Sequence, residues 1–310
     1  MSERRVGSVN LAIFLVLVST GDLMALDPQS DARHDAQHRI NVSGRQRMLS
    51  QRLAKSTCLA LRMPGNGEML KEMGEARSLF ISSMKALRSG SPEIGLAPEK
   101  DADSLPLIDT ATELADEYEK AIDAFVAELA VKPNQERLEA IYEMSLPLLI
   151  ALNDAVEQLE AQHEDGHLIR RGLAHALNAS GRQRMLSQKM SKELCMLAFG
   201  YKAQETRAHL MGTIALFESS HEALKRGLTP MKLNDSDASA ISSQLALIER
   251  HWQELGKIFI RVRDGDDPTE EDVKTVASDS RSLLVELNQA VEMYEALDIP
   301  VIAKSTTSEH

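Results

Sequence analysis

Apolar residues recur along most of the chain at the three- and four-residue spacing that is typical of amphipathic helices. With 100° of rotation per residue, Val42, Leu49, Leu53 and Ala60 fall on one stripe of the first such helix. Stretches rich in Gly, Pro and Asn interrupt the pattern and divide the chain into segments. The sequence predicts helices over residues 33–63, 67–89, 102–130, 134–163, 168–200, 204–227, 236–263 and 269–297.

One sequence pattern occurs twice. Residues 41–58 read NVSGRQRMLSQRLAKSTC and residues 178–195 read NASGRQRMLSQKMSKELC, so that nine consecutive residues, SGRQRMLSQ, recur unchanged at an offset of 137. Weaker matches follow in the same order, as expected of a tandem duplication. We therefore expect an all-α protein with one four-helix bundle at 33–163, a second at 168–298 and a tail at 299–310.

The two predicted bundles are joined by the short sequence HEDGH at 163–167, which contains Gly166. A tight turn at this glycine would set the bundles side by side, with both first helices pointing the same way about a pseudo-twofold axis. A single helix running through Gly166 would instead join the bundles end to end. We expect the side-by-side arrangement, which resembles a homodimer fused into one chain.

The unchanged residues lie on the polar side of the first helix of each bundle. Arg47 points away from the apolar stripe, and small or polar residues surround it. A merely solvated face tolerates substitution within about 0.5 kcal/mol, so it would have diverged after the duplication. Gly44 and Gly181 strengthen this argument, because glycine inside a helix costs about 1 kcal/mol relative to alanine. We therefore expect this face to pack against the other first helix.

Such packing would bring Arg47 and Arg184 into one seam between the first helices, where their charges repel each other and need to be offset. The nine repeated residues include no Asp or Glu, which favours a small external anion. A guanidinium group presents a planar fork of donors that matches planar oxyanions. The candidate anion-binding residues are Arg47, Arg184, Gly44, Gly181, Ser43, Ser180, Ser50, Ser187, Gln51 and Gln188.

The repeated motif resembles the first-helix signature of PilJ-type sensor domains, the N-terminal domains of type IV pilus chemotaxis transducers. This signature has Gly, then Arg-Met three positions later, then Ser, then a basic residue four positions after the Met. The matching residues are Gly44, Arg47, Met48, Ser50 and Arg52, and in the second copy Gly181, Arg184, Met185, Ser187 and Lys189.

The resemblance extends to the periplasmic domains of the nitrate and nitrite sensor kinases NarX and NarQ. It implies that the domains pair and that nitrate or a related anion lies between the first helices, held by Arg47 and Arg184. Ligands vary among PilJ-type domains, so an anion is implied more firmly than nitrate. Because the chain ends in the polar sequence KSTTSEH, we expect a sensor module without its own transmitter domain.

The ends and composition of the chain narrow the functions further. Two arginines followed by an apolar run from Leu11 to Val18 are typical of a signal peptide, at 1–25, which predicts export to the periplasm; an uncleaved anchor is the alternative. A net charge of −12 argues against nucleic acid as a partner. The sequence contains no catalytic or phosphate-binding motif, so we expect neither enzymatic activity nor a cofactor.

Cys58 and Cys195 also recur at the offset of 137 and would share the seam. The sequence favours two small buried thiols, and in an oxidising periplasm a disulfide between them is the alternative.

Other polar residues are expected to have structural or surface roles. Hydrogen bonding within the fold is the favoured role of Asn153 with Glu157 and of their counterparts Asn288 with Glu292. Because no third ligand accompanies the histidine pairs at 34 and 38 and at 163 and 167, we expect surface residues and no metal site. The Asn-X-Ser triplets at 41 and 178 match a glycosylation pattern but receive no functional role.

Two functions are consistent with these observations. The first is a periplasmic sensor module that binds a small anion such as nitrate or nitrite between Arg47 and Arg184 and is read by a membrane receptor or signalling protein. The second is a helical interaction scaffold without a ligand, whose seam joins the bundles or docks a receptor or pilus component.

Overall fold

The computed structural model describes residues 28–129, 131, 134–165, 169, 171–231 and 233–297, which form eight α-helices. The first four are α1 (Pro28–Arg62), α2 (Gly67–Ser89), α3 (Ser104–Leu129) and α4 (Gln135–Asp165). The second four are α5 (Arg171–Ala198), α6 (Ala203–Met231), α7 (Asp235–Arg263) and α8 (Glu270–Glu295). The all-α fold predicted from the hydrophobic spacing is confirmed.

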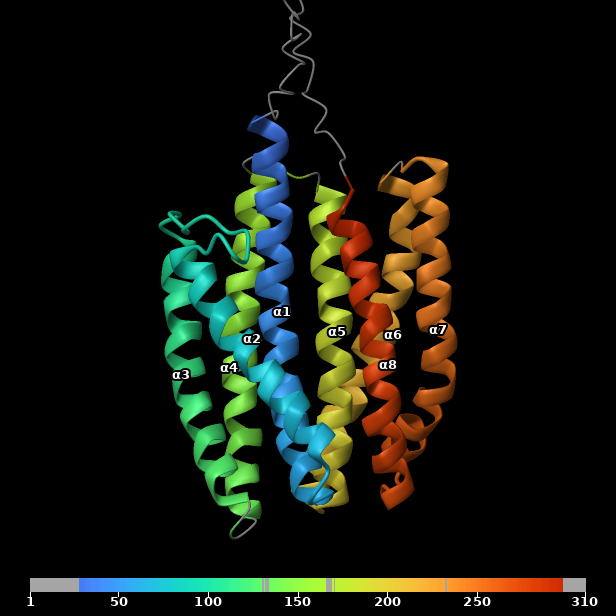
Figure 1. Cartoon of the computed structure of the whole chain (residues 1–310). Coiled ribbons are helices and arrows are strands. Elements are labelled where there is room, and N and C mark those ends of the chain that lie inside the picture. Colours follow the sequence, from blue (N-terminus) through green and yellow to red (C-terminus); the bar gives the residue numbers. More distant parts are fainter. Residues whose placement is uncertain are drawn as a thin grey trace, which may run out of the picture.

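Each set of four helices closes into a bundle, and the two bundles stand next to each other (Figure 1). In the first bundle α1 packs on α2 and α4, and α3 completes the ring; α5, α6, α7 and α8 repeat this order in the second. The bundles meet along α1 and α5, with further contacts from α4 to α5 and from α8 to α1. The first helices are therefore the centre of the molecule.

Several helices begin where the sequence provides a capping side chain. Asn66 accepts main-chain hydrogen bonds at the start of α2, and Asn234 does so at the start of α7. A capping box formed by Thr269 and Asp272 is present at the start of α8. Two boundaries differ from the prediction by four or five residues. The helix α1 begins at Pro28, five residues before the predicted start, and α6 continues through the GLTP sequence at 227–230 to Met231.

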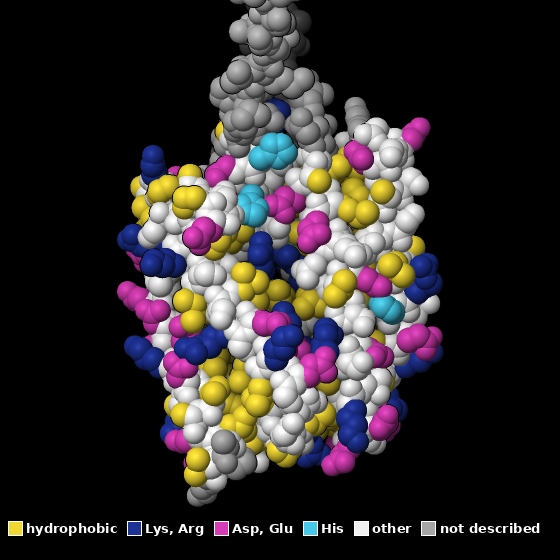
Figure 2. All heavy atoms as spheres, in the orientation of Figure 1, with side chains coloured by type: hydrophobic (Ala, Val, Ile, Leu, Met, Phe, Trp, Pro, Cys, Tyr) yellow, Lys and Arg dark blue, Asp and Glu magenta, His cyan; other side chains and the backbone are white. Residues whose placement is uncertain are grey.

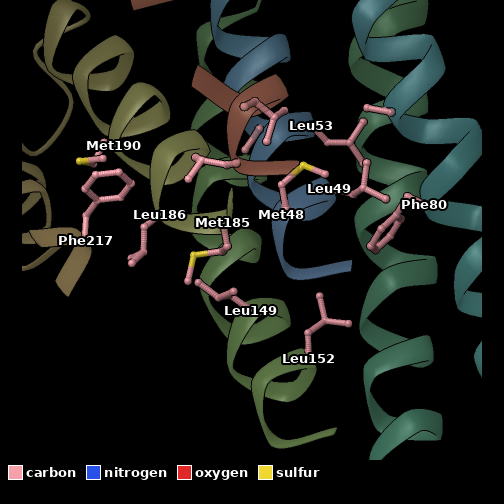
Figure 3. Packing of buried hydrophobic residues seen from close by; sticks show 14 of the residues in the cluster. Met48, Leu49, Leu53, Phe80, Leu149, Leu152, Met185, Leu186, Met190 and Phe217 are labelled. Atoms are coloured by element: carbon pink, nitrogen blue, oxygen red, sulfur yellow. The ribbon is translucent and has the colours of Figure 1, made fainter. Parts of the chain in front are cut away.

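The two cores have matching residues in matching places. Figure 3 shows Leu49, Leu53 and Phe80 inside the first bundle, and their counterparts Leu186, Met190 and Phe217 inside the second. All six side chains are at most 1% exposed. Burial of an apolar side chain of this size contributes about 1.5 to 3 kcal/mol, so the predicted apolar stripe of α1 anchors it in its own bundle.

The seam between α1 and α5 consists of two parallel helices in register. Gly44 lies beside Gly181 and Cys58 lies beside Cys195, so residues 137 apart face each other at both places. The side-by-side arrangement is confirmed, and the end-to-end alternative is wrong. Within α1, residues 39–60 are buried except for Arg45 and Arg52, and within α5 residues 176–197 are buried except for Arg182 and Lys189.

A disulfide joins Cys58 to Cys195 across the seam, with 6.2 Å between the two Cα atoms. The favoured interpretation of two free thiols is therefore wrong. The repeat placed both cysteines on the seam face, but it could not show that the first helices approach closely enough for the bond. Both residues are fully buried, so the bond fixes the register of α1 against α5.

The predicted signal peptide at 1–25 and the tail at 299–310 lie outside the described residues. So does most of the junction after α4. Among the helices that the structure describes, none has the length and hydropathy that a membrane span requires.

Replacing both cysteines by serine tests the contribution of the disulfide. The bond closes a loop of 137 residues, so its removal is expected to lower the free energy of unfolding by about 3 to 5 kcal/mol. Urea denaturation followed by circular dichroism measures this change, with wild type reduced under denaturing conditions as the control. An unchanged denaturation midpoint would contradict the bond.

Candidate functional site

Arg47 projects from α1 into the seam and is fully buried. Its Nη1 donates to Oδ1 of Asn153 on α4 at 2.7 Å, and its Nη2 donates to Oδ1 and the main-chain oxygen of Asn178 on α5, at 2.8 and 3.4 Å. The guanidinium group is thus held from both bundles. All three oxygens belong to neutral amides, so these contacts orient the cation without neutralising it.

Arg184 repeats this arrangement from the other side and is 3% exposed. Its Nη1 donates to Oδ1 of Asn288 on α8 at 3.4 Å, and its Nη2 donates to Oδ1 and the main-chain oxygen of Asn41 on α1, at 2.8 and 3.4 Å. Among the described residues, Nε of each arginine is buried without a hydrogen-bond partner. The predicted hydrogen-bonding role of Asn153 and Asn288 is confirmed.

The two guanidinium groups converge on the glycines of the repeated motif. A Cβ atom placed on Gly44 would lie 3.4 Å from Nη2 of Arg47 and 3.9 Å from Nη2 of Arg184. A Cβ atom placed on Gly181 would lie 3.5 and 3.6 Å from Nη2 of Arg184 and Arg47, and 4.0 Å from Cα of Gly44. Each arginine therefore reaches the same point beside the glycine pair.

The surroundings of Arg47 and Arg184 disfavour the charged forms of both side chains. Burial lowers the pKa of Arg47 to about 9, assisted by the charge of Arg182, while Glu160 and Glu157 act in the opposite direction. Burial, Arg45 and Arg47 lower the pKa of Arg184 to about 9 in the same way. Both groups remain cationic at neutral pH. Figure 2 shows Lys and Arg side chains in a hollow of the surface between α1 and the second bundle.

The predicted serines share the seam but bond within their own helices. Each hydroxyl donates to the main-chain oxygen three residues earlier, at 2.8 to 3.1 Å; the four residues are Ser43, Ser50, Ser180 and Ser187. Gln51 and Gln188 lie one turn beyond the arginines, and Nε2 of each donates to the preceding serine at 3.2 Å. The structure thus brings together the arginines and glycines, with the serines and glutamines beside them.

Two asparagines that hold the arginines were missed at the sequence level. The triplets at 41 and 178 received no functional role, yet Asn41 and Asn178 supply most of the acceptors just described. Their amide nitrogens donate in turn to Glu295 on α8 and Glu160 on α4. Both asparagines recur at the offset of 137 and precede the unchanged residues by two positions, and that recurrence was the available signal.

The two copies differ in the partners of a pair of buried lysines, which follow the arginines along α1 and α5. Lys192 on α5 donates to Oε1 of Gln51 at 2.7 Å and to Oγ of Ser145 at 2.9 Å, and its Nζ lies 4.6 Å from the centre of the Tyr142 ring. Its counterpart Lys55 instead pairs with Glu72 at 2.9 Å. The second copy has His209 where Glu72 would recur, so Lys192 lacks an equivalent carboxylate.

Arg52 and Lys189, the basic residues that end the PilJ-like signature, pair with carboxylates instead of joining the arginine pair. Nε of Arg52 pairs with Glu72 at 2.9 Å, and Lys189 pairs with Glu193. Both are ion pairs at the edge of the seam.

The histidines are only partly surface residues. His34 is exposed, but His38 is half-buried and bonded to Glu295, and His163 is 6% exposed, so the surface prediction is wrong for these two. His167 lies outside the described residues. Periodicity on one helix could not reveal the neighbouring segments that cover these positions. Across the part of the chain that the structure describes, no group of three or more potential ligands is placed to hold a metal.

Replacing Gly44 by alanine tests why the glycines persist. The added Cβ would meet only ordinary contacts, at 3.4 Å or more, so the variant is expected to gain about 0.5 to 1 kcal/mol of stability from helix propensity. Thermal and urea denaturation measure the change. Gly74→Ala is the matched control, because nothing lies within 4 Å of a Cβ at that helical position. Destabilisation of Gly44→Ala alone would show that the seam is tighter than described.

Lys192→Met tests the cost of the unpaired lysine. Burial lowers the pKa of Lys192 from the usual 10.5 to about 7, so the folded state binds fewer protons than the unfolded state between these values. The cost is therefore greatest below about pH 7 and disappears towards pH 10.5. The stability of Lys192→Met relative to wild type should be higher at pH 6.5 than at pH 9.5. Exposed Lys274→Met should show no such difference, and equal values for Lys192→Met would contradict the burial argument.

Comparison with known proteins identifies the domain. The chain matches the family described as "Type IV pili methyl-accepting chemotaxis transducer N-term" over residues 30–140 and again over 169–276. It is 31% identical over 120 residues to the methyl-accepting chemotaxis protein McpN of Pseudomonas aeruginosa, a stretch covering 39% of this chain and 22% of that protein. No solved structure matches the chain. The chain therefore belongs to the family of type IV pili methyl-accepting chemotaxis transducer N-terminal domains, whose sequence it contains twice.

Proposed function

We propose that the protein is a periplasmic sensory module that binds one small planar anion, nitrate or nitrite, between Arg47 and Arg184. The coarse part of this assignment, a sensory or signalling module, follows from the family. The ligand, the site and the periplasmic location are the further steps of the proposal. The two bundles then act as the paired domains of a receptor dimer, fused into one chain.

The observation that carries the proposal is a pair of buried cations whose direct contacts are all with neutral groups. Among the described residues, the hydrogen-bond acceptors of both guanidinium groups are amide oxygens. Leaving two like charges together in a dry seam is unfavourable. One bound anion would attract both guanidinium groups, reduce their repulsion and give the unpartnered Nε atoms an acceptor.

The two guanidinium groups approach one point beside the glycine pair. The Nη2 atoms of both arginines lie within 3.9 Å of the Cβ position on Gly44, so a single small oxyanion can contact both groups. A guanidinium fork binds two oxygens of one anion, and nitrate and nitrite are smaller than sulfate. We therefore expect nitrate and nitrite to bind more tightly than sulfate.

Binding would be signalled through the relative placement of α1 and α5. A bound anion reduces the repulsion between the arginines and favours the arrangement that brings the guanidinium groups closest to the ligand. Both helices span their bundles, so a change at the seam reaches the ends of the molecule (Figure 1). The relative McpN is a methyl-accepting chemotaxis protein, and we propose a membrane receptor or chemotaxis component as the partner that reads the change.

A ligand-free interaction scaffold is the second candidate. It is favoured by the observation that each guanidinium group already makes three hydrogen bonds and that the seam serines are satisfied within their own helices. In that case the arginines only join the two bundles.

Thermal-shift measurements with nitrate, nitrite and sulfate separate the two candidates. A ligand at one hundred times its Kd stabilises the folded state by about 2.7 kcal/mol, so the melting temperature of wild type should rise with nitrate. Arg47→Ala and Arg184→Ala each remove charged hydrogen bonds worth about 1.5 to 3 kcal/mol and should weaken binding by about 10- to 100-fold in isothermal titration. Arg250→Ala, at an exposed position, is the control.

Gly44→Ala gives a second, independent test. Its Cβ would lie 3.4 Å from Nη2 of Arg47 and 3.9 Å from Nη2 of Arg184, where the proposed anion would contact both groups. Nitrate binding should therefore be lost, although the variant is expected to be at least as stable as wild type. Unchanged nitrate affinity in Gly44→Ala and Arg47→Ala would remove the proposed site. A melting temperature insensitive to all three anions would favour the scaffold.

A further inference from the structure

We infer that the protonated ring of His38, acting through Glu295 and Asn41, helps to hold the Arg184 guanidinium in place, so that one arm of the arginine pair responds to pH. His38 is thus a positioning residue for Arg184. The consequence for anion affinity rests on the proposed function, but the coupling of His38 to Arg184 does not.

A continuous chain of contacts links His38 to Arg184. Nδ1 of His38 lies 2.5 Å from Oε1 of Glu295 at the end of α8. The other carboxylate oxygen of Glu295 accepts from the amide nitrogen of Asn41, and Oδ1 of Asn41 accepts from Nη2 of Arg184 at 2.8 Å. Because an amide group is rigid, fixing its nitrogen on Glu295 also fixes the oxygen that holds Arg184.

The two nitrogens of the His38 ring both face acceptors. Nε2 lies 2.7 Å from the main-chain oxygen of Ile94, in the turn closed by the bridge between Ser91 and Leu96. A carbonyl and a carboxylate can only accept, so both contacts are hydrogen bonds only when both ring nitrogens carry protons. A neutral ring has one donor and gives up either Ile94 or Glu295.

Charged groups around His38 come from three elements. Glu295 on α8 favours the protonated ring and Arg45 on α1 opposes it. His34 and Asp35 on α1 and Glu93 in the 91–96 turn line the same open cleft. Figure 2 shows histidine side chains near the upper end of α1 with acidic side chains beside them. Protons from solvent therefore reach the ring.

These contacts determine the pH range of the effect. The hydrogen bond to Glu295 raises the pKa of His38 above the usual 6.5, partly offset by burial and assisted by the Ile94 carbonyl. A raised histidine pKa means that the contribution is complete below about pH 6.5 and is lost as the pH rises through the higher folded-state value. The arm that holds Arg184 should loosen as the pH rises above 6.5 and through the folded-state pKa of His38.

The pseudo-symmetric arm provides an internal comparison. His175 stands in the place of His38 and Glu160 in that of Glu295, and Glu160 accepts from Asn178, which holds Arg47. Nδ1 of His175 lies 3.7 Å from Glu160, beyond hydrogen-bond distance, and its side chain is 71% exposed. The Arg47 arm therefore has the carboxylate and the amide but lacks the bonded histidine.

NMR of the arginine Nε–Hε groups tests the coupling without any ligand. Both Nε atoms are buried, which slows exchange with water and makes their signals observable. In wild type the Arg184 signal should shift as the pH is raised from 6, with the same midpoint as the His38 ring, above 6.5, while the Arg47 signal stays fixed. In His38→Gln the shift of Arg184 should disappear, and in the matched control His175→Gln it should persist.

The outcomes separate this inference from the proposed function. An Arg184 signal that is independent of pH in wild type, or that moves equally in His38→Gln, overturns the inference. If nitrate binds, wild type and His175→Gln should bind it several-fold more tightly at pH 6 than at pH 8. His38→Gln should bind nitrate with the same affinity at both pH values. Equal affinity at the two pH values in wild type overturns the link between His38 and the ligand. If no anion binds at any pH, the proposed function fails and the NMR result alone decides the coupling.

Discussion

Two cations can be placed together inside a protein only when neighbouring atoms compensate for the loss of water and for their repulsion. Arg47 and Arg184 impose this requirement on the contact between α1 and α5. The glycines at the crossing leave room for the guanidinium groups, the asparagines orient them, and Glu160 and Glu295 stand behind the asparagines as second-layer negative charge. The residues that recur unchanged in the repeat thus include those that place the two buried charges.

Pseudo-twofold symmetry explains why each arginine depends on both bundles. Arg47 extends from the first bundle but is held by Asn178 of the second, and Arg184 by Asn41 of the first. The two copies nevertheless differ at two places near this centre. Lys55 has a carboxylate partner and Lys192 does not, and His38 is bonded whereas His175 is exposed. A fused pair allows such differences, whereas a homodimer of identical chains would have both sides the same in sequence.

Much of this organisation follows from the sequence, and the remainder depends on distances that periodicity cannot provide. The apolar stripe of α1 placed Leu49 and Leu53 in the core, and the repeat placed Arg47 and Arg184 in one seam. Helical angles could not show that Asn41 reaches across to the other bundle, because such contacts depend on how two helices are spaced and aligned. The same limit applies to Cys58 and Cys195 and to the covering of His163. The sequence-level view of a helix as having one buried face failed for α1, which is buried on nearly all sides.

The position of the disulfide determines how the seam can move. It ties α1 to α5 near the end of α1, about 16 Å along the helix from Arg47 and about 45 Å from the first residue of α1 at 28. With that point fixed, a change in separation at the arginines becomes a rotation rather than a parallel displacement. By proportion of these lengths, a 1 Å change at Arg47 becomes about 3 Å at the start of α1. The covalent bond thus acts as a pivot, and the opposite end of the molecule undergoes the larger excursion.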